Sequence, residues 1–217
     1  MLQEACFFNP YSLFTIYYLL FTIFYSLFST YYFLLSLLHP ILLPLTAGTD
    51  MQVLQTDRLR VRTLTENDHH DFFLLQGDPD VMRFIRPVKT REESDAALND
   101  MLAAGEPEEG GRWMVEEKES GAFVGTLAII PLPYDPTKIQ LGYALIPAHW
   151  GKGYATELAK AGLQYFWEHT TRDEIFAVTE TPNIASQQVL LKAGFHLLLK
   201  RDLDGKPVLV YVAKREG

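Results

Sequence analysis

Two glycines, Gly151 and Gly153, separate an apolar segment from an amphipathic one. Residues 139–146 are largely apolar on both alternating faces, which is typical of a central strand. Residues 155–169 repeat apolar side chains at helical spacing, which predicts a helix packed against that strand. The chain is therefore expected to fold around a strand–turn–helix unit of the α/β class. The backbone N–H groups at the start of the helix would be open to an anion.

Spacing alone does not identify that anion. A dinucleotide-binding fingerprint needs a glycine where Thr156 stands. A P-loop needs a glycine where Ile146 stands and a Ser or Thr after Lys152. Neither pattern is present. On spacing alone, a plain strand-to-helix turn is as good an interpretation as a phosphate-binding turn.

Charge divides the chain into two parts. Glu4 and Asp50 are the only charged residues before Met51, and every Lys and Arg lies after it. A chain of 217 residues usually holds one domain or one domain with an appendage. We therefore predict an uncharged hydrophobic extension over residues 1–50 and a single folded domain over residues 51–217.

The extension has two interpretations that the sequence leaves open. Residues 11–45 are long and apolar enough to cross a bilayer, and the arginines that follow would keep the domain on the cytoplasmic side. Alternatively, the residue types before Met51 are those that T-rich non-coding DNA encodes, and translation begins at Met51. A secretory signal peptide fits less well, because no Lys or Arg precedes the apolar run. The domain is expected in the cytoplasm in either case, with membrane contact only through residues 11–45.

Composition also excludes several functions for the folded part. The formal net charge is −8, and removing Glu4 and Asp50 leaves −6 for residues 51–217. An acidic domain is a poor partner for a nucleic-acid backbone and mildly favours cationic substrates. Cys6 is the only cysteine, so neither an intramolecular disulfide nor a cysteine metal cluster is expected, and no metal is predicted.

The rest of the domain alternates between strand and helix patterns. Prolines at positions 131, 133 and 136 predict a loop over residues 131–136, because a central strand does not tolerate them. The order of elements predicts a mixed central sheet of about six to seven strands with helices on both faces. Besides 139–146, strands are expected at 56–62, 113–117, 124–130, 174–179, 195–202 and 207–213, and besides 155–169, helices at 65–76, 90–104 and 186–192.

The run from Gly142 to Glu157 resembles the coenzyme A signature of the GCN5-related N-acetyltransferase (GNAT) superfamily. It is most similar to the branch that acetylates ribosomal-protein N-termini. Residues 183–186 and 190–195 are similar to that branch's closing motif, and residues 56–62 to its opening strand. The resemblance covers residues 52–214. It implies the GNAT fold, in which the central parallel strands splay apart.

The resemblance also implies acetyl-CoA as the cosubstrate. The strand end at Leu145 and Ile146 would pair with the pantetheine arm, and residues 151–156 would cradle the pyrophosphate. Asn183 would bind the pantetheine, and Ser186 would lie beside the thiol. Alternatively, Asn183 is only an N-cap and Ser186 only a polar residue in the first helical turn. The expected cofactor-binding residues are Leu145, Ile146, Gly151, Lys152, Gly153, Tyr154, Ala155, Thr156, Asn183 and Ser186.

Two departures from the family concern proton transfer. Many members carry a tyrosine acid where this chain has Leu190, and the N-terminal-acetylating branch often has an acid where this chain has Gln140. We therefore expect Ser186 or water to protonate the thiolate. Glu180 and His149 are candidate bases acting through water. A weak base suffices for an α-amine, whose deprotonation at pH 7 requires about 1.4 kcal/mol, compared with about 4.6 for lysine.

The resemblance implies direct acetyl transfer to a primary amine, with main-chain N–H groups near Ile146 stabilising the oxyanion. The acceptor is expected to be a protein N-terminus or a small-molecule amine such as a polyamine or an amino sugar. Phe84, Trp113 and Tyr143 are predicted to line the acceptor side. The alternative is a non-catalytic acetyl-CoA sensor or scaffold. Either a monomer or a homodimer is compatible with the sequence.

Overall fold

The computed structural model describes residues 51–105, 107 and 109–215. The predicted hydrophobic extension over residues 1–50, with its candidate membrane segment at 11–45, lies outside the described residues. Within the described ranges, no helix is long and apolar enough to cross a bilayer.

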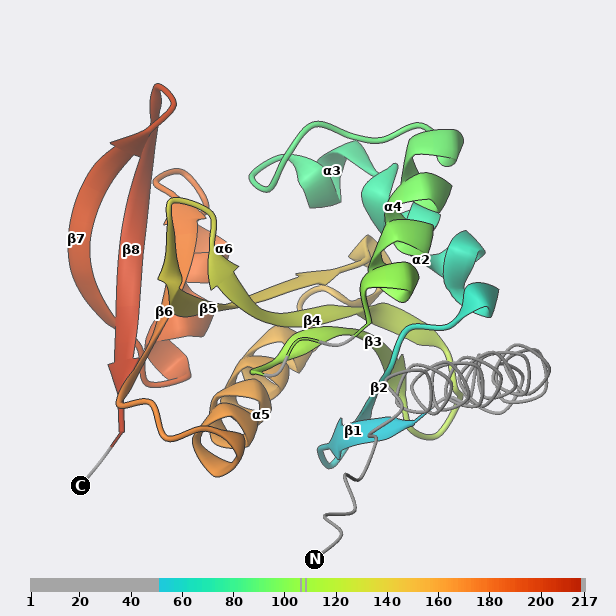
Figure 1. Cartoon of the computed structure of the whole chain (residues 1–217), viewed down its shortest axis with the longest axis horizontal. Helices are drawn as coiled ribbons and strands as arrows, with labels where there is room; N and C mark the ends of the chain where they lie inside the picture. Colours follow the sequence, from blue (N-terminus) through green and yellow to red (C-terminus); the bar gives the residue numbers. More distant parts are fainter. Residues whose placement is uncertain (1–50, 106, 108, 216–217) are drawn as a thin grey trace, which may run out of the picture. The chain divides into compact units, whose positions relative to one another are not determined.

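A mixed sheet forms the centre of the domain (Figure 1). Among the described residues it has eight strands in the order β1-β2-β3-β4-β5-β6-β8-β7, and only β5 and β6 run parallel. The expected mixed sheet is confirmed, but it has one strand more than predicted because residues before Thr56 pair with the predicted first strand as a hairpin. The strands are β1 Gln52–Gln55, β2 Leu59–Arg62, β3 Gly111–Glu117, β4 Phe123–Leu132, β5 Asp135–Leu145, β6 Glu174–Glu180, β7 His196–Leu203 and β8 Lys206–Lys214.

Helices cover both faces of the sheet, as predicted. Figure 1 shows α2, α3 and α4 on one side of the strands and α5 on the other. Helix α3 was not predicted, because four residues are too few to show a helical period. The helices are η1 Glu66–Asp68, α2 His69–Gln76, α3 Pro79–Met82, α4 Arg91–Ala104, η2 Pro147–His149, α5 Tyr154–His169 and α6 Ile184–Lys192.

Strand β3 shows how one sequence serves both faces. Trp113 and Val115 are fully buried in the core shared with α5 and α6. Met114, which lies between them, is fully buried in the separate core shared with α2, α3 and α4. Successive strand residues point to opposite faces, so a residue on β3 can be assigned to a face by counting from Met114. We call these two surfaces the α5 face and the α4 face of the sheet.

A buried ion pair connects β2 to η1. Arg62 forms two hydrogen bonds with Asp68, at 2.6 and 2.8 Å, and its Nε donates to Glu116 on β3 at 2.5 Å. Asp68 also accepts from the Thr65 backbone N–H at 2.7 Å, which completes a capping box. Burial raises the pKa of Asp68, but the bonds from Arg62 and Thr65 outweigh it and hold that pKa below its usual value.

The predicted loop over residues 131–136 is wrong. Strand β4 includes Pro131, β5 includes Pro136, and a two-residue turn joins the strands. Prolines are tolerated here because this hairpin end extends past its neighbours in the sheet. The ladder from β3 ends opposite Ile129, and β5 pairs with β6 only at Gln140. The missing proline N–H groups therefore cost no ladder bond.

The parallel strands β5 and β6 separate after one pair of residues. Their register contains only Gln140 opposite Phe176. Beyond this pair, the carboxyl-terminal part of β5, which ends at Leu145, has β4 as its ladder partner and β6 no longer alongside. The splay implied by the family resemblance is therefore present. We call this opening the β5–β6 split.

Replacing Gly125 with alanine is expected to lower the free energy of unfolding by about 2 kcal/mol. A Cβ at Gly125 would lie 2.1 Å from the Ala144 carbonyl oxygen on β5, so the two strands would have to move apart. Urea unfolding followed by circular dichroism measures the change. Gly142→Ala is the matched control on β5, since a Cβ there meets nothing within 4 Å. Equal midpoints for the two variants would contradict the close approach.

Candidate functional site

The glycine turn lies between η2 and α5, at the carboxyl end of β5. Gly151 has a φ of 73° and Gly153 a φ of 82°, a conformation that other residues adopt only with strain. Gly153 is the N-cap residue of α5. Because glycine has no side chain, no side-chain acceptor caps the backbone N–H groups of the first turn. A Cβ at Gly151 would meet nothing within 4 Å. The turn thus presents uncapped N–H groups beside open space, an arrangement that suits a phosphate.

Arg58, just before β2, lies against this turn and was not singled out from the sequence. Its Nη1 donates to the Lys152 carbonyl at 3.0 Å, and its guanidinium pairs with Glu157 at 2.5 Å. Thr56 donates to the same carboxylate at 2.5 Å. Burial raises the pKa of Glu157, but the bonds from Thr56 and Arg58 outweigh it and hold that pKa below its usual value. The pairing places positive charge beside Gly153 and offsets an acid in the first turn of α5.

Backbone direction decides which groups of β5 face the split. The Ile146 N–H donates to the Val124 carbonyl at 3.0 Å, so it faces β4 and is already used. Successive residues of a strand direct their N–H and C=O groups to opposite sides, so those of Leu145 face the split. The Leu145 carbonyl accepts from the Trp150 indole N–H at 2.7 Å. Of the two residues expected to pair with the pantetheine arm, Leu145 is therefore the one whose N–H faces the split.

A hydroxyl pair lies between β5 and α6. Tyr143 Oη and Ser186 Oγ are 3.1 Å apart, and Tyr143 Oη lies 3.4 Å from the Ser186 carbonyl. Tyr143 packs against the core on the α5 face. Burial raises its pKa to about 12, against a smaller lowering by the bond with Ser186. Tyr143 is thus placed with the expected cofactor residue Ser186, whereas the sequence assigned it to the acceptor side.

Asn183 is the N-cap of α6. Its Oδ1 accepts from the Ser186 N–H at 3.1 Å. The capping role, one of the two alternatives considered from sequence, is therefore present. The cap uses only the oxygen of the amide, so the NH₂ group of Asn183 is not consumed by it.

The candidate bases are both held by other side chains. Glu180 accepts from Lys206 Nζ at 3.0 Å. His149 is buried, stacks on the Tyr154 ring at a centroid distance of 5.8 Å, and has Lys152 Nζ 3.5 Å from its Nδ1. Each candidate base therefore has a lysine ammonium beside it, at Glu180 Oε1 and at His149 Nδ1.

The predicted acceptor residues differ in exposure. Trp113 is fully buried on the α5 face and packs edge-on against Tyr165, so its side chain has no surface that an acceptor could contact. The same alternation that buries Met114 against α4 turns Trp113 to the opposite side. Phe84 lies in the segment between α3 and α4 and is partly buried, with the Arg83 guanidinium 5.1 Å from its ring centroid.

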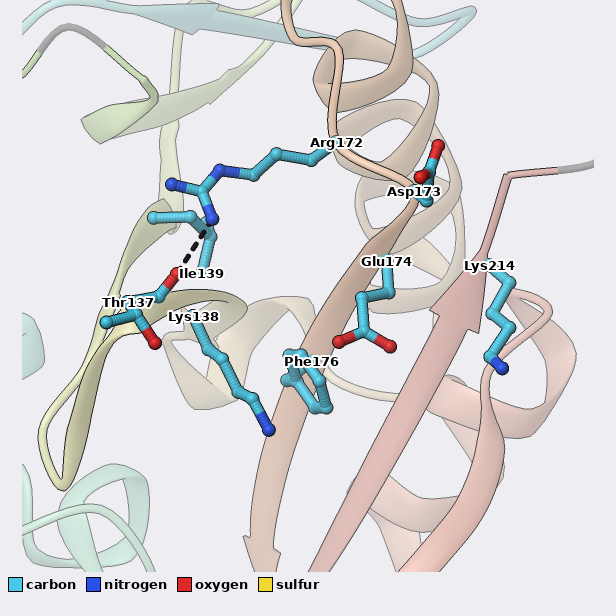
Figure 2. Close-up of a pocket in the computed structure, with 8 residues that line it drawn as sticks. All are labelled: Thr137, Lys138, Ile139, Arg172, Asp173, Glu174, Phe176 and Lys214. Atoms are coloured by element: carbon cyan, nitrogen blue, oxygen red, sulfur yellow. Dashed lines mark hydrogen bonds between the residues drawn. The ribbon is translucent and has the colours of Figure 1, made fainter.

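A cavity of about 540 Å³ lies at the other end of the parallel strands (Figure 2). It is lined by Thr137 and Lys138 of β5, Glu174 of β6 and Lys214 of β8, with Arg172 donating to the Thr137 carbonyl at 2.8 Å. Thr137, Lys138 and Glu174 lie at the starts of β5 and β6, and Lys214 ends the antiparallel β8. The glycine turn instead follows the end of β5, so this cavity is separate from the turn. Within the described ranges, no cluster of His, Cys, Asp or Glu side chains could hold a metal ion.

Comparison with known proteins agrees with this geometry. The family model described as "Acetyltransferase (GNAT) domain" matches residues 58–196. The uncharacterized protein YkkB of Bacillus subtilis is 32% identical over 163 residues, which are 74% of this chain and 95% of YkkB.

Two solved structures share the fold at low sequence identity. One is a RimL ribosomal L7/L12 alpha-N-protein acetyltransferase in complex with coenzyme A, with a TM-score of 0.64 and 15% identity, covering 76% of this chain and 98% of the other. The second is spermidine N-acetyltransferase from Vibrio cholerae in complex with CoA and spermine. Its TM-score is 0.62 and its identity 18%, and the match covers 73% of this chain and 96% of the other.

Proposed function

The chain belongs to the GNAT acetyltransferase domain family, and on that premise we propose that it transfers the acetyl group of acetyl-CoA directly to a primary amine. It is an acyltransferase with the GNAT fold. One observation carries the proposal. The β5–β6 split borders the carboxyl-terminal part of β5, and the glycine turn at Gly151 and Gly153 follows the end of the same strand. Together they offer a phosphate site and an adjoining slot for an extended arm.

The residues of this chain fit the cosubstrate at three places. The first turn of α5, with Lys152 and Arg58 beside it, would hold the pyrophosphate. The backbone of Leu145 in the split would bind the pantetheine arm. The Asn183 amide would bind the same arm from the other side, with Ser186 near the thiol. When bound, acetyl-CoA supplies the acetyl group as an activated thioester.

The hydroxyl pair gives the site a means to stabilise the leaving sulfur. Either hydroxyl can be the donor at this distance. When Tyr143 Oη–H donates to Ser186 Oγ, the Ser186 O–H is left to form a hydrogen bond with the sulfur. The acceptor nitrogen forms the new C–N bond as the C–S bond breaks, and the sulfur keeps the electron pair. The nitrogen releases its proton to water, and the thiolate is protonated from water. The Leu145 N–H is the donor on the split side that can stabilise the oxyanion.

The acceptor is proposed to be an amine of low pKa, because both candidate bases, Glu180 and His149, have a lysine ammonium beside them. An α-amine meets this condition more easily than a lysine side chain. The two solved relatives act, by name, on a ribosomal protein α-amine and on spermidine. Membership of the branch that acetylates ribosomal-protein N-termini stays a prediction, as does a cytoplasmic location.

An acetyl-transfer screen tests the proposed function. Purified protein is incubated with acetyl-CoA and with amino acids, polyamines, amino sugars or peptides with free N-termini, and thiol release is followed together with the mass of the acceptor. Acceptor-dependent thiol release with a gain of one acetyl group is expected. Binding of acetyl-CoA without turnover on any acceptor would instead support the non-catalytic sensor.

Gly151→Ala is expected to weaken coenzyme A binding about tenfold. The backbone at Gly151 is left-handed, and its Cβ would enter the open space assigned to the pyrophosphate. Isothermal titration calorimetry with coenzyme A measures the effect. Gly121→Ala is the matched control, since it has a φ of 69° and open space around its Cβ but lies in the turn between β3 and β4. Similar losses of affinity in both variants would contradict the assignment.

A further inference from the structure

Two arginines on the α4 face have no acidic partner within the described residues. Arg112 lies on β3 two residues before Met114, so its side chain is on the same face. Arg86 follows α3, and its backbone N–H donates to the Met82 carbonyl at 3.2 Å. Both side chains belong to partly buried residues. Among the described residues, neither guanidinium forms an ion pair or a hydrogen bond.

The register of the sheet places Arg112 in line with the β5–β6 split. Arg112 is opposite Ala128 on β4, and Ala128 is opposite Gly142 on β5. Residues directly opposite point to the same face, and neighbouring strands are about 4.8 Å apart, so Gly142 lies about 10 Å across the sheet from the Arg112 backbone. A Cβ at Gly142 would meet nothing within 4 Å. On the α4 face, small residues therefore lie between Arg112 and the split: Ala128 is buried, and the space above Gly142 is open.

The electrostatics of the pair favour an anion. Burial lowers the pKa of Arg86. Burial also lowers the pKa of Arg112, and the charge of Arg86 lowers it further. The two arginines flank one core, because Met82, four residues before Arg86, and Met114, two residues after Arg112, both belong to it. Two partly buried like charges are unfavourable without a counter-charge. A carboxylate or phosphate would satisfy both guanidinium groups through paired N–H···O bonds.

We propose that Arg86 and Arg112 bind an anionic group of the acceptor, so that the preferred substrates are amines that also carry a carboxylate or a phosphate. The inference rests on the proposed function, because it assigns the α4 face beside Gly142 to the acceptor. The inference adds a requirement for negative charge on the acceptor, which does not follow from the fold or from the cofactor site. Polyamines become poor acceptors, since they would meet the same positive charges as a repulsive surface.

Matched pairs of acceptors test the proposal. One arm compares an aminoalkyl carboxylate with its amide, and another compares an aminoalkyl phosphate with the parent amino alcohol, so that the two anions are distinguished. In the wild type, at least one anionic acceptor is expected to exceed its neutral counterpart about tenfold in kcat/KM. Arg112→Gln and Arg86→Gln are expected to remove that advantage and to change kcat/KM for the neutral counterpart less than about twofold.

Arg83→Gln is the matched control, because Arg83 is an exposed arginine in the same segment as Arg86. It is expected to keep the preference for the anion. Arg112→Glu provides a second test and should favour a cationic acceptor over the anionic ones. Coenzyme A affinity, measured by calorimetry, reports whether each variant is folded.

Two results would overturn the inference while leaving acetyl transfer intact. One is equal kcat/KM for charged and neutral acceptors in the wild type. The other is a loss of the same size on both acceptors in the arginine variants. If no acceptor in the panel releases thiol, the proposed function itself fails, and the two failures are thereby distinguished.

Discussion

Ser186→Ala is expected to lower kcat about a hundredfold while the dissociation constant of coenzyme A changes less than about twofold. The Ser186 hydroxyl is proposed to donate to sulfur only as the C–S bond breaks, so its loss affects the transition state and not ground-state binding. Initial rates at saturating acetyl-CoA and calorimetric titration measure the two quantities. A rise in the dissociation constant that accounts for the whole loss in kcat/KM would instead assign Ser186 to binding.

Tyr143→Phe isolates the second hydroxyl of the same pair. It keeps the ring in the core and removes only the group 3.1 Å from Ser186 Oγ. We expect kcat to fall about tenfold, and the double variant to be no slower than Ser186→Ala, because a positioning residue has no effect without the group it positions. With a pKa of about 12, Tyr143 stays neutral, so the wild type and Tyr143→Phe should have the same pH profile from pH 6 to 9.

Tyr134→Phe is the matched control for that substitution. Tyr134 lies in the turn between β4 and β5, at the opposite end of β5 from the glycine turn. It should keep the wild-type kcat. Multiplicative losses in the double variant would contradict the relay, since they would show that Tyr143 and Ser186 act separately.

Asp68→Asn is expected to lower the free energy of unfolding at pH 7 by about 3 kcal/mol. The substitution keeps the shape of the side chain but removes one of the two carboxylates that bond to Arg62 in this ion pair. Glu116 is the other and remains. An incompletely neutralised buried guanidinium is costly, whereas exposed charges contribute little. Urea unfolding measures the change, and Asp100→Asn, an exposed aspartate on α4, should stay within about 0.5 kcal/mol of the wild type.

The same variant should differ from the wild type in its response to acid. Because the folded-state pKa of Asp68 is depressed, its contribution is fully present above the unfolded-state value of about 3.9. It is lost as the pH falls from there through the lower folded-state pKa. The stability difference between the wild type and Asp68→Asn should therefore shrink below about pH 4. A difference that is the same at pH 7 and pH 3 would contradict the ion-pair interpretation.

Local patterns predicted most of the fold, and long-range pairing accounts for the errors. Apolar residues on both faces of β5 predicted its central position. The helix expected at 90–104 is α4, whose start at Thr90 is fixed by a capping box with Glu93. The strands through Pro131 and Pro136 could not be predicted, because proline is excluded only where a neighbouring strand requires its N–H. The lengths of those neighbours are not visible within residues 131–136.

The candidate site divides in the same way. The uncapped turn at Gly151 follows from local spacing, and the structure shows the expected geometry. The contact between Tyr143 and Ser186 joins residues 43 positions apart, and that of Arg58 with Glu157 joins residues 99 positions apart. Such contacts depend on how α6 and β2 pack, which no single segment encodes. The burial of Trp113 on the α5 face could not be predicted, because an aromatic side chain in a strand gives no indication of which face it occupies.

The single residue pair between β5 and β6 has a consequence for how such a domain can change over time. All the elements proposed to recognise the acceptor, from α2 to β5, precede the split, whereas Asn183 and Ser186 follow it. Within the described residues, the core on the α4 face contains no residue beyond Ile146, so substitutions in that core need few compensating changes after the split. Acceptor choice can thus diversify on the α4 face while Asn183 and Ser186 stay unchanged beside the donor.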